Sequence, residues 1–394
     1  MEAKITNLIN FAQGMYRGEN GKELYQEYLS DIRQVTPQDI FLVENEQLKM
    51  GLTPKEMLMV VDKLLNVFHK SLVDYPWIKP EADSFLFVMM EENQGLLSVL
   101  DEFKALVKRQ DYQKDRTLVL EYLERLLEYN RHLLKLENIL FPYMEKTMER
   151  FEGLKIMWSL HDRVREDLKQ LIAKVKSGEL DGQTMNADIG FLFFELHGLV
   201  HKQELIMFPS ATEVLNEADF HQMLIQSFDY GFSFIEVPEK PLGQQGGKID
   251  LEAGLPVDGV IQMETGTMTV EQMECMVNTL PVDITFVNAD DKVAFFSRPE
   301  ERFFPRSVAI IGRDVRNCHP PERVDIVEQI LKDFKGGKKN RQSFWIQMKG
   351  MFILIQYFSV RNSQGKYLGT LEVSQEISGL RSLEGEKRLL NDEK

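Results

Sequence analysis

The chain has 394 residues, more than one hydrophobic core usually serves, which predicts two or three domains. Its formal net charge of −15 repels phosphate backbones and argues against nucleic acid as a partner. No stretch has the apolar length that spans a bilayer, and the N-terminus lacks the pattern of a signal peptide, so we expect a cytoplasmic protein without membrane contact. Two cysteines are too few for a disulfide framework.

Residues 1–75 predict two or three short helices. Thr36-Pro37 and Thr53-Pro54 repeat one helix-start pattern, in which Thr is the N-cap and Pro the first helical residue. An acidic residue follows in each first turn, where the helix dipole favours it. We expect a small helical domain here.

Residues 80–230 carry apolar side chains at steps of three and four, which is typical of amphipathic helices. The long runs cover residues 83–108, 117–150, 154–177 and 184–216, and short polar breaks separate the last two. Four helices with short connections predict an up-and-down four-helix bundle.

Residues 236–266 are rich in Pro, Gly and polar residues and predict a linker. The apolar period then changes to two. We expect a hairpin around residues 289–291, a helix over 322–334 and three strands over 341–349, 352–362 and 366–376, followed by a short C-terminal helix and tail over 381–394. The expected fold is multidomain: an all-α N-terminal part followed by an α+β domain with an antiparallel sheet over 267–380.

Apolar side chains alternate along these strands and predict one inner face of the sheet, which we interpret as core and dimer contact. The predicted inner residues are Ile284, Phe286, Phe344, Ile346, Phe352, Leu354 and Leu371.

Four of the seven histidines fall on the predicted bundle: His132, His161, His197 and His201. His197, His201 and Glu204 are spaced four and three apart, so they share one helix face, which we expect to point inward. Imidazole and carboxylate groups suit non-haem iron. Buried histidines also pair with carboxylates without any metal, and both interpretations stay open.

Two segments end in the pattern E-x-x-x-[FM]-P, namely His132–Pro142 and His201–Pro209. Together with Met157–Asp162 they resemble the hemerythrin HHE cation-binding domain. This resemblance implies one or two non-haem irons that respond to dioxygen, nitric oxide, peroxide or redox state. The expected metal ligands are His132, Glu137, His161, His197, His201 and Glu204.

Three departures from the family pattern put that site in doubt. The segment Asp83–Phe87 has no histidine ahead of Glu92-Asn93, where the family's first helix normally supplies one. Glu137 follows His132 by five residues, whereas many members have four. Gln203 replaces one of two adjacent acidic residues. A vacant or structural site is therefore an alternative.

Residues 268–390 resemble a PAS domain in stretches such as NTLPVDITFVN and YLGTLEVSQEI. PAS domains hold haem, flavin, another small ligand or nothing. Cys318 and His319 are possible haem ligands, although Pro320 and Pro321 favour a plain helix start. The first 70 residues resemble a small helical domain of unknown function that precedes HHE and PAS domains in bacterial proteins.

We therefore expect a non-enzymatic sensor or regulator that dimerises through its PAS domain and signals through an unknown partner protein. One alternative is a metal-free scaffold or interaction protein. A second alternative is a non-haem iron enzyme that acts on peroxide or nitric oxide.

Overall fold

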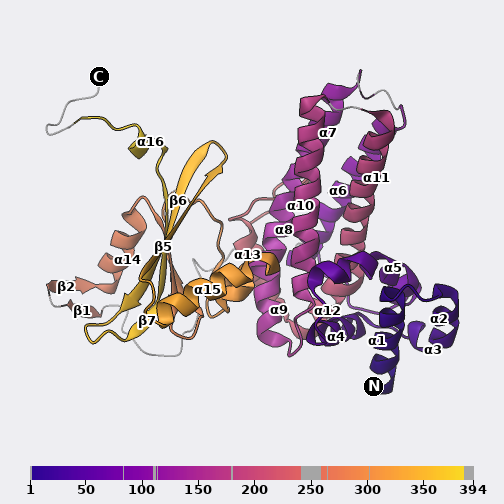
Figure 1. The fold of residues 1–394 in the computed structure, drawn as a ribbon, viewed down its shortest axis with the longest axis horizontal. Coiled ribbons are helices and arrows are strands. Elements are labelled where there is room, and N and C mark those ends of the chain that lie inside the picture. Colours follow the sequence, from indigo (N-terminus) through magenta and orange to yellow (C-terminus); the bar gives the residue numbers. More distant parts are fainter. Residues whose placement is uncertain are drawn as a thin grey trace. The chain divides into compact units, whose positions relative to one another are not determined.

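The computed structural model describes residues 2–82, 84–109, 112, 114–178, 181–240, 259–263, 265–300 and 302–385. These residues divide into a helical unit and a sheet-containing unit, which we describe separately (Figure 1). Most of the predicted linker, position 83 of the first bundle helix and residues 386–394 of the predicted tail lie outside the described residues.

The helical unit begins with five helices rather than the expected two or three: α1 (Glu2–Tyr16), α2 (Gly21–Glu27), α3 (Leu29–Ile32), α4 (Pro37–Lys49) and α5 (Pro54–Val73). The two predicted helix starts are confirmed. Thr36 caps α4 and Thr53 caps α5, each with Pro at the first helical position, and the carboxylate of Asp39 or Glu56 accepts a hydrogen bond from the backbone N–H of its cap residue.

The bundle consists of four long antiparallel helical stretches, as predicted (Figure 1). The first is α6 (Phe85–Val107) and the third is α10 (Leu154–Ser177). The second contains α7 (Arg116–Leu126), α8 (Asn130–Lys135) and α9 (Phe141–Thr147), and the fourth contains α11 (Gly182–Lys202) and α12 (Phe208–Val214). A shorter helix, α13 (Glu217–Ser227), packs against α6.

The second and fourth stretches each contain one π turn, over Leu136–Leu140 and Gln203–Met207. Each π turn immediately precedes a Phe-Pro pair, Pro142 or Pro209. Proline has no N–H and its ring clashes with the carbonyl four residues back, so the helix widens ahead of it. The wide turn shifts which side chains face the core.

The N-terminal helices and the bundle share one hydrophobic core. Helices α4 and α5 pack against the π turn at Gln203–Met207, and α5 also packs against α10 and α11. Helix α11 is therefore covered on more than one side, which matters for the site described below. Within the described residues, no helix is both long and apolar enough to cross a lipid bilayer.

The second unit contains a five-stranded antiparallel sheet in the order β4-β3-β7-β6-β5. Its strands are β3 (Asp283–Asn288), β4 (Val293–Phe296), β5 (Arg341–Met348), β6 (Met351–Arg361) and β7 (Tyr367–Glu376). The hairpin and the three later strands are confirmed. Helix α15 (Val324–Lys335) packs on β6 and β7, and a small hairpin of β1 (Val260–Met263) and β2 (Gly266–Thr269) leads into α14 (Val270–Thr279). A one-turn helix, α16 (Ser378–Arg381), follows β7.

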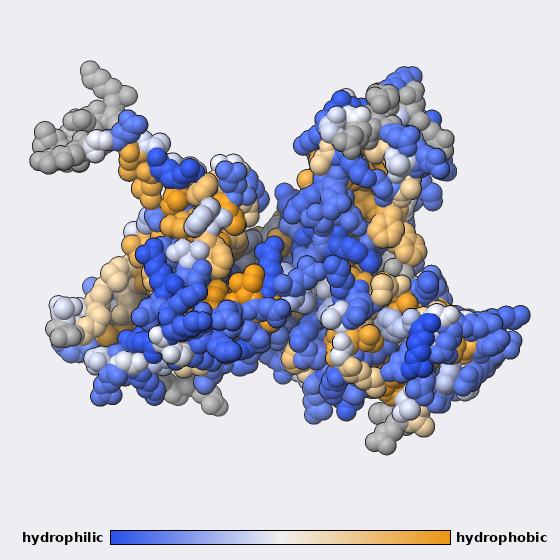
Figure 2. All heavy atoms as spheres, viewed as in Figure 1, coloured by the Kyte–Doolittle hydropathy of each residue, from blue (hydrophilic) through white to orange (hydrophobic). Residues whose placement is uncertain are grey.

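The predicted inner face of this sheet is wrong. The register places Ile284, Phe286, Leu354, Phe352 and Leu371 on one face, whereas Phe344 and Ile346 lie on the other. The buried side of β3 carries Asp283, Thr285 and Val287 instead, because the strand alternates in the opposite phase. The covered face thus carries polar side chains beside apolar ones such as Val287 and Ile353, and hydrophobic residues also gather at the surface of this unit (Figure 2).

Candidate functional site in the helical bundle

A chain of buried polar groups centres on Glu92 of α6. Its Oε2 lies 2.9 Å from Nδ1 of His132, and its Oε1 accepts from Lys135 Nζ at 2.5 Å and from the Ser233 amide at 2.7 Å. Glu92, His132 and Lys135 are all fully buried. The carboxylate therefore has an ammonium, an imidazole and a backbone amide as partners.

The second nitrogen of His132 is also engaged. Its Nε2 lies 2.9 Å from Oε1 of Gln203, which comes from the π turn after α11. The Tyr129 hydroxyl donates to Asn93 Oδ1 at 2.8 Å, and the Tyr129 ring stacks on His132 with 4.6 Å between centroids. Asn93 in turn donates to Glu204 at 3.1 Å. Both imidazole nitrogens of His132 are thus committed to protein partners.

A second buried group joins His161 of α10 to Glu137. His161 Nδ1 lies 2.7 Å from Glu137 Oε1, and Arg165 Nη2 lies 2.8 Å and 2.9 Å from the two oxygens of the same carboxylate. Arg165 also donates to Asn130 at 2.7 Å. Glu137 is buried although it stands five residues after His132, because it falls in the π turn that widens the helix.

The electrostatics follow from burial and pairing. Burial alone would raise the pKa of Glu92 and of Glu137, but the bonds from His132 and Lys135, and from Arg165 and His161, hold both below the ordinary value. Burial lowers the pKa of His132 and His161 despite their carboxylate partners. These two groups together therefore contain two carboxylates, two cations and two neutral imidazoles, so their charges balance.

Two of the predicted ligands, His197 and His201, lie outside these groups, and Glu204 reaches them only through Asn93. His201 is exposed and His197 is half-buried, so the stripe predicted to point inward faces away from the bundle core. His201 instead packs against His69 of α5, with 5.5 Å between ring centroids. Glu204 is half-buried and bonds only to Asn93 among the described side chains.

The reason lies in the packing of α11. The core is occupied instead by residues next to the His201 stripe in the sequence, namely Leu196, Leu199 and Gln203. On another side Lys202 is buried against Glu44 of α4 at 2.6 Å. Phe194, an apolar residue of the predicted inward stripe, is likewise exposed, so this stripe does not face the core.

Comparison with known proteins assigns both units. Residues 84–211 match the model of the hemerythrin HHE cation binding domain, and residues 273–378 match that of a PAS domain. The chain contains a hemerythrin HHE domain followed by a PAS domain. No curated protein matches it.

Three solved structures are similar to part of the chain. A C-terminal domain from Streptococcus mutans is 30% identical, with a TM-score of 0.32, and the match covers 33% of this chain and 100% of that chain. A PAS domain from Colwellia psychrerythraea is 14% identical (TM-score 0.23; 28% and 98% covered). A sensory box sensor histidine kinase from Vibrio cholerae is 11% identical (TM-score 0.21; 26% and 87% covered).

Hemerythrin HHE domains usually hold non-haem iron, and the residues present do not fit that role. Glu92 is bound to Lys135, Glu137 is bound to Arg165, and both nitrogens of His132 are engaged. Among these donors only His161 Nε2 has no partner in the described part of the chain. The described residues contain no group of three or more His, Cys, Asp or Glu side chains suited to a metal ion.

Lys135 and Arg165 are the residues that sequence reasoning missed. Each follows a predicted ligand, His132 or His161, by three or four positions and therefore shares its helix face. A basic residue at that spacing is the signal that could have indicated an internal cation beside the buried carboxylates.

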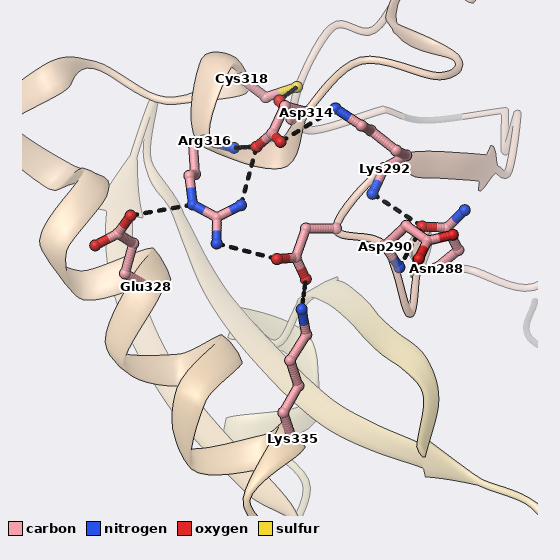
Figure 3. Close-up of polar contacts among 9 residues, drawn as sticks. Asn288, Asp290, Lys292, Asp314, Arg316, Cys318, Glu328 and Lys335 are labelled. Carbon is pink, nitrogen blue, oxygen red and sulfur yellow. Dashed lines mark hydrogen bonds and ion pairs between the residues drawn. The ribbon is translucent and has the colours of Figure 1, made fainter. Parts of the chain in front are cut away.

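In the PAS domain, Cys318 and His319 lie at the end of a short 3₁₀ turn, Val315–Cys318, that Asp314 caps. The Cys318 thiol lies 3.7 Å from the Asp314 carbonyl oxygen, and His319 is partly buried. Figure 3 shows how the turn is anchored: Arg316 binds Asp314 and Glu328, and its guanidinium also donates to a carboxylate of the β3–β4 hairpin. These local contacts account for the position of Cys318. Haem ligation by Cys318 or His319 stays a prediction.

Proposed function

We propose that this protein is a regulatory protein in which the PAS domain receives the signal and the hemerythrin-like bundle works without iron. The domain pair supports the regulatory role. The pairing of Lys135 with Glu92 is the observation that carries the second part, since an ammonium occupies the carboxylate that a metal ion would need.

The charges already present beside the two carboxylates argue against a metal ion. A ferrous ion adds two positive charges to a core whose two carboxylates already have one cation each. Metal binding would then require displacement of a fully buried ammonium, and the cost of a buried charge without its partner is several kcal/mol, on the order of 3–5. The His–Glu pairs support a structural role, because they join the first three helical stretches of the bundle: His132 to Glu92 of α6, and His161 of α10 to Glu137.

The deciding experiment is iron content. Untagged protein is incubated anaerobically with ferrous iron, desalted and measured by plasma mass spectrometry together with an absorbance spectrum. We expect far less than one iron per chain and a melting temperature that a chelator leaves unchanged, because a ligand bound only to the native state raises stability. One or two irons per chain, lost in a His132→Ala/His161→Ala variant, would overturn the proposal.

The same proposal includes a homodimer through the PAS sheet. The less buried face carries Phe352, Leu354 and Leu371, and Trp345 on this face is 65% exposed. An apolar strand face of this kind is typical of an interaction surface. Sedimentation should show a dimer for the full chain, and Trp345→Glu should shift it toward monomer. A monomer at all concentrations would contradict this part.

A further inference from the structure

Helix α11 turns charged side chains inward and large apolar ones outward. Glu195 and Lys202 are buried, whereas Phe191 is 51% and Phe194 is 48% exposed. Both buried charges are paired within the helical unit, with side chains of α10 and α4. Charged residues are almost never fully buried and large apolar ones usually are, so this helix reverses the usual distribution. Its outward face has the composition of a surface that another protein covers.

The outward residues of α11 follow one regular spacing. Steps of four and three residues connect Gln183, Ala187, Gly190, Phe194, His197 and His201. All of them are exposed except His197, which is half-buried, and none is Asp, Glu, Lys or Arg. Figure 2 shows hydrophobic side chains at the surface along α11. A repeat of about 3.5 residues is that of the seam along which two helices pack.

The side-chain sizes in this stripe are arranged about Phe194. The small residues Ala187 and Gly190 precede it, and the imidazoles of His197 and His201 follow it at similar distances. A Cβ atom added at Gly190 would meet no atom within 4 Å, so there is open space above this position. A two-fold axis at Phe194 would pair α11 with α11 of a second copy in antiparallel fashion. Each imidazole of one copy then lies against a small residue of the other.

Two charges of α6 fit the same arrangement. Asn93 of α6 donates to Glu204, just beyond the end of α11, which places these two residues at one level of the bundle. The two helices are antiparallel and rise equally per residue, so Asp101 and Lys104, further along α6, lie at levels on either side of Phe194. Both are exposed. The same two-fold axis therefore brings Asp101 of one copy to the level of Lys104 of the other, twice.

These charges favour a second copy over an unrelated partner. Asp101 and Lys104 are opposite in sign, so the flank of the stripe that they form is complementary to itself. Both lie close enough to act on His197 of the stripe. On the flank formed by α10, Lys174 donates to Asp188 at 2.6 Å, so this pair adds no net charge.

We propose that two copies of this chain pair through α11, antiparallel and about a two-fold axis at Phe194. This contact goes beyond the PAS contact proposed above and joins the same two chains. One helix pair buries much less than the roughly 1,600 Å² of a standard stable interface, so the contact is weak by itself. The PAS contact holds the two bundles at a high effective concentration, at which a weak second contact forms.

Cross-linking in the full chain tests the position of the axis. Phe194→Cys is made together with Cys275→Ser, because Cys275 is exposed, and is treated with a short bismaleimide. We expect a covalent dimer on a denaturing gel, since the two copies of position 194 face each other. The matched control is Leu118→Cys in the same background: Leu118 is 42% exposed on α7, which packs against α6 and α10. No dimer for Phe194→Cys, or equal yields for the two variants, would overturn the proposal.

A substitution at Gly190 separates pairing from folding. Leucine fits in the open space of the single chain and is a better helix former than glycine, so Gly190→Leu should leave the melting temperature of the dilute protein unchanged or higher. In the dimer its side chain meets an imidazole of the other copy, so the dimer dissociation constant from sedimentation should rise about tenfold or more. Gly190→Ala adds one methyl group and should weaken the dimer less. A Gly190→Leu dimer as tight as the wild type would contradict the antiparallel contact.

The PAS contact and the α11 contact fail separately. A dimer that Trp345→Glu weakens, but that gives no cross-link at position 194, overturns the α11 pairing alone. A cross-linked dimer that Trp345→Glu leaves unchanged overturns the PAS contact alone and supports the α11 pairing.

Discussion

The Nζ atom of Lys135 lies 2.5 Å from Oε1 of Glu92, and both side chains are fully buried in a bundle of the hemerythrin type. The ammonium also lies 4.4 Å from the centre of the Phe232 ring. A lysine in this position accounts for a buried carboxylate without a metal ion. It also makes the bundle core sensitive to the loss of a single cation.

The first prediction concerns this pair. Lys135→Met keeps the side-chain volume but leaves Glu92 buried with His132 and the Ser233 amide as its partners. We expect the free energy of unfolding to fall by about 3–5 kcal/mol, as for other broken buried ion pairs. Urea denaturation measures this loss.

Two further variants test the cause. Glu92→Gln combined with Lys135→Met removes both charges, so it should recover a substantial part of the lost stability. Lys169→Met, at an exposed position of α10, should change stability by less than about 0.5 kcal/mol. A Lys135→Met variant as stable as the wild type would show that the pair is not formed in solution.

The second prediction concerns the planar fork of Arg165. Arg165→Lys keeps the charge but loses contacts that three guanidinium nitrogens make: Nη2 binds both oxygens of Glu137, Nε donates to Asn130 and Nη1 donates to Asp162. We expect a loss of about 1–3 kcal/mol. The matched control is Arg125→Lys, because Arg125 pairs with Glu102 at the surface. This control should cost less than about 0.5 kcal/mol. Equal effects of the two changes would contradict these buried contacts.

The bundle helices and the main strands of the fold were predictable from local chemistry, whereas the number of N-terminal helices was not. The Thr-Pro starts at Thr36 and Thr53 fixed two helices, and the change of apolar period marked the passage from bundle to sheet. Such signals depend on residues close in sequence, so they can be recognised without knowledge of the tertiary structure.

The side of a helix or strand that faces the core was harder to predict than the type of secondary structure. Gln203 is fully buried whereas His201, two residues before it, is exposed, and the apolar residues around both did not show which side of the helix faces the core. In the PAS sheet, the polar Thr285 faces the covered side and the hydrophobic Phe286 faces the other side, the reverse of what their hydrophobicity predicts. Tertiary packing decided both cases, whereas Glu137 turns inward because the π turn ahead of Pro142 widens the helix.

The third prediction is a pH dependence. The pKa of His132 and of His161 is lowered in the folded state, from an ordinary value of 6.5. The unfolded chain therefore binds protons first as the pH falls, and the free energy of unfolding decreases below pH 6.5. The lowered pKa of Glu92 and Glu137 adds a further loss below their ordinary value of 4.5.

Denaturation at a series of pH values measures this slope, and His161→Gln isolates one histidine. The difference in stability between wild type and variant should shrink as the pH falls from 7.5 to 5.5, a range of about one unit on each side of the ordinary histidine value. A difference that stays constant or grows over this range would mean that His161 keeps or raises its pKa on folding.

The last prediction separates the two sets of histidines. His132→Ala leaves Glu92 and Gln203 each without one buried partner and opens a space beside Tyr129, so we expect a loss of about 2–4 kcal/mol. His201→Ala removes an exposed ring that touches only His69 among the described aromatic side chains, and it should cost less than about 1 kcal/mol. The two variants are compared by urea denaturation in the presence of a chelator, which removes metal as a cause. If His201→Ala were the less stable of the two variants, the prediction that His201 points into the bundle would be supported. An exposed imidazole has no buried partner whose loss could destabilise the fold.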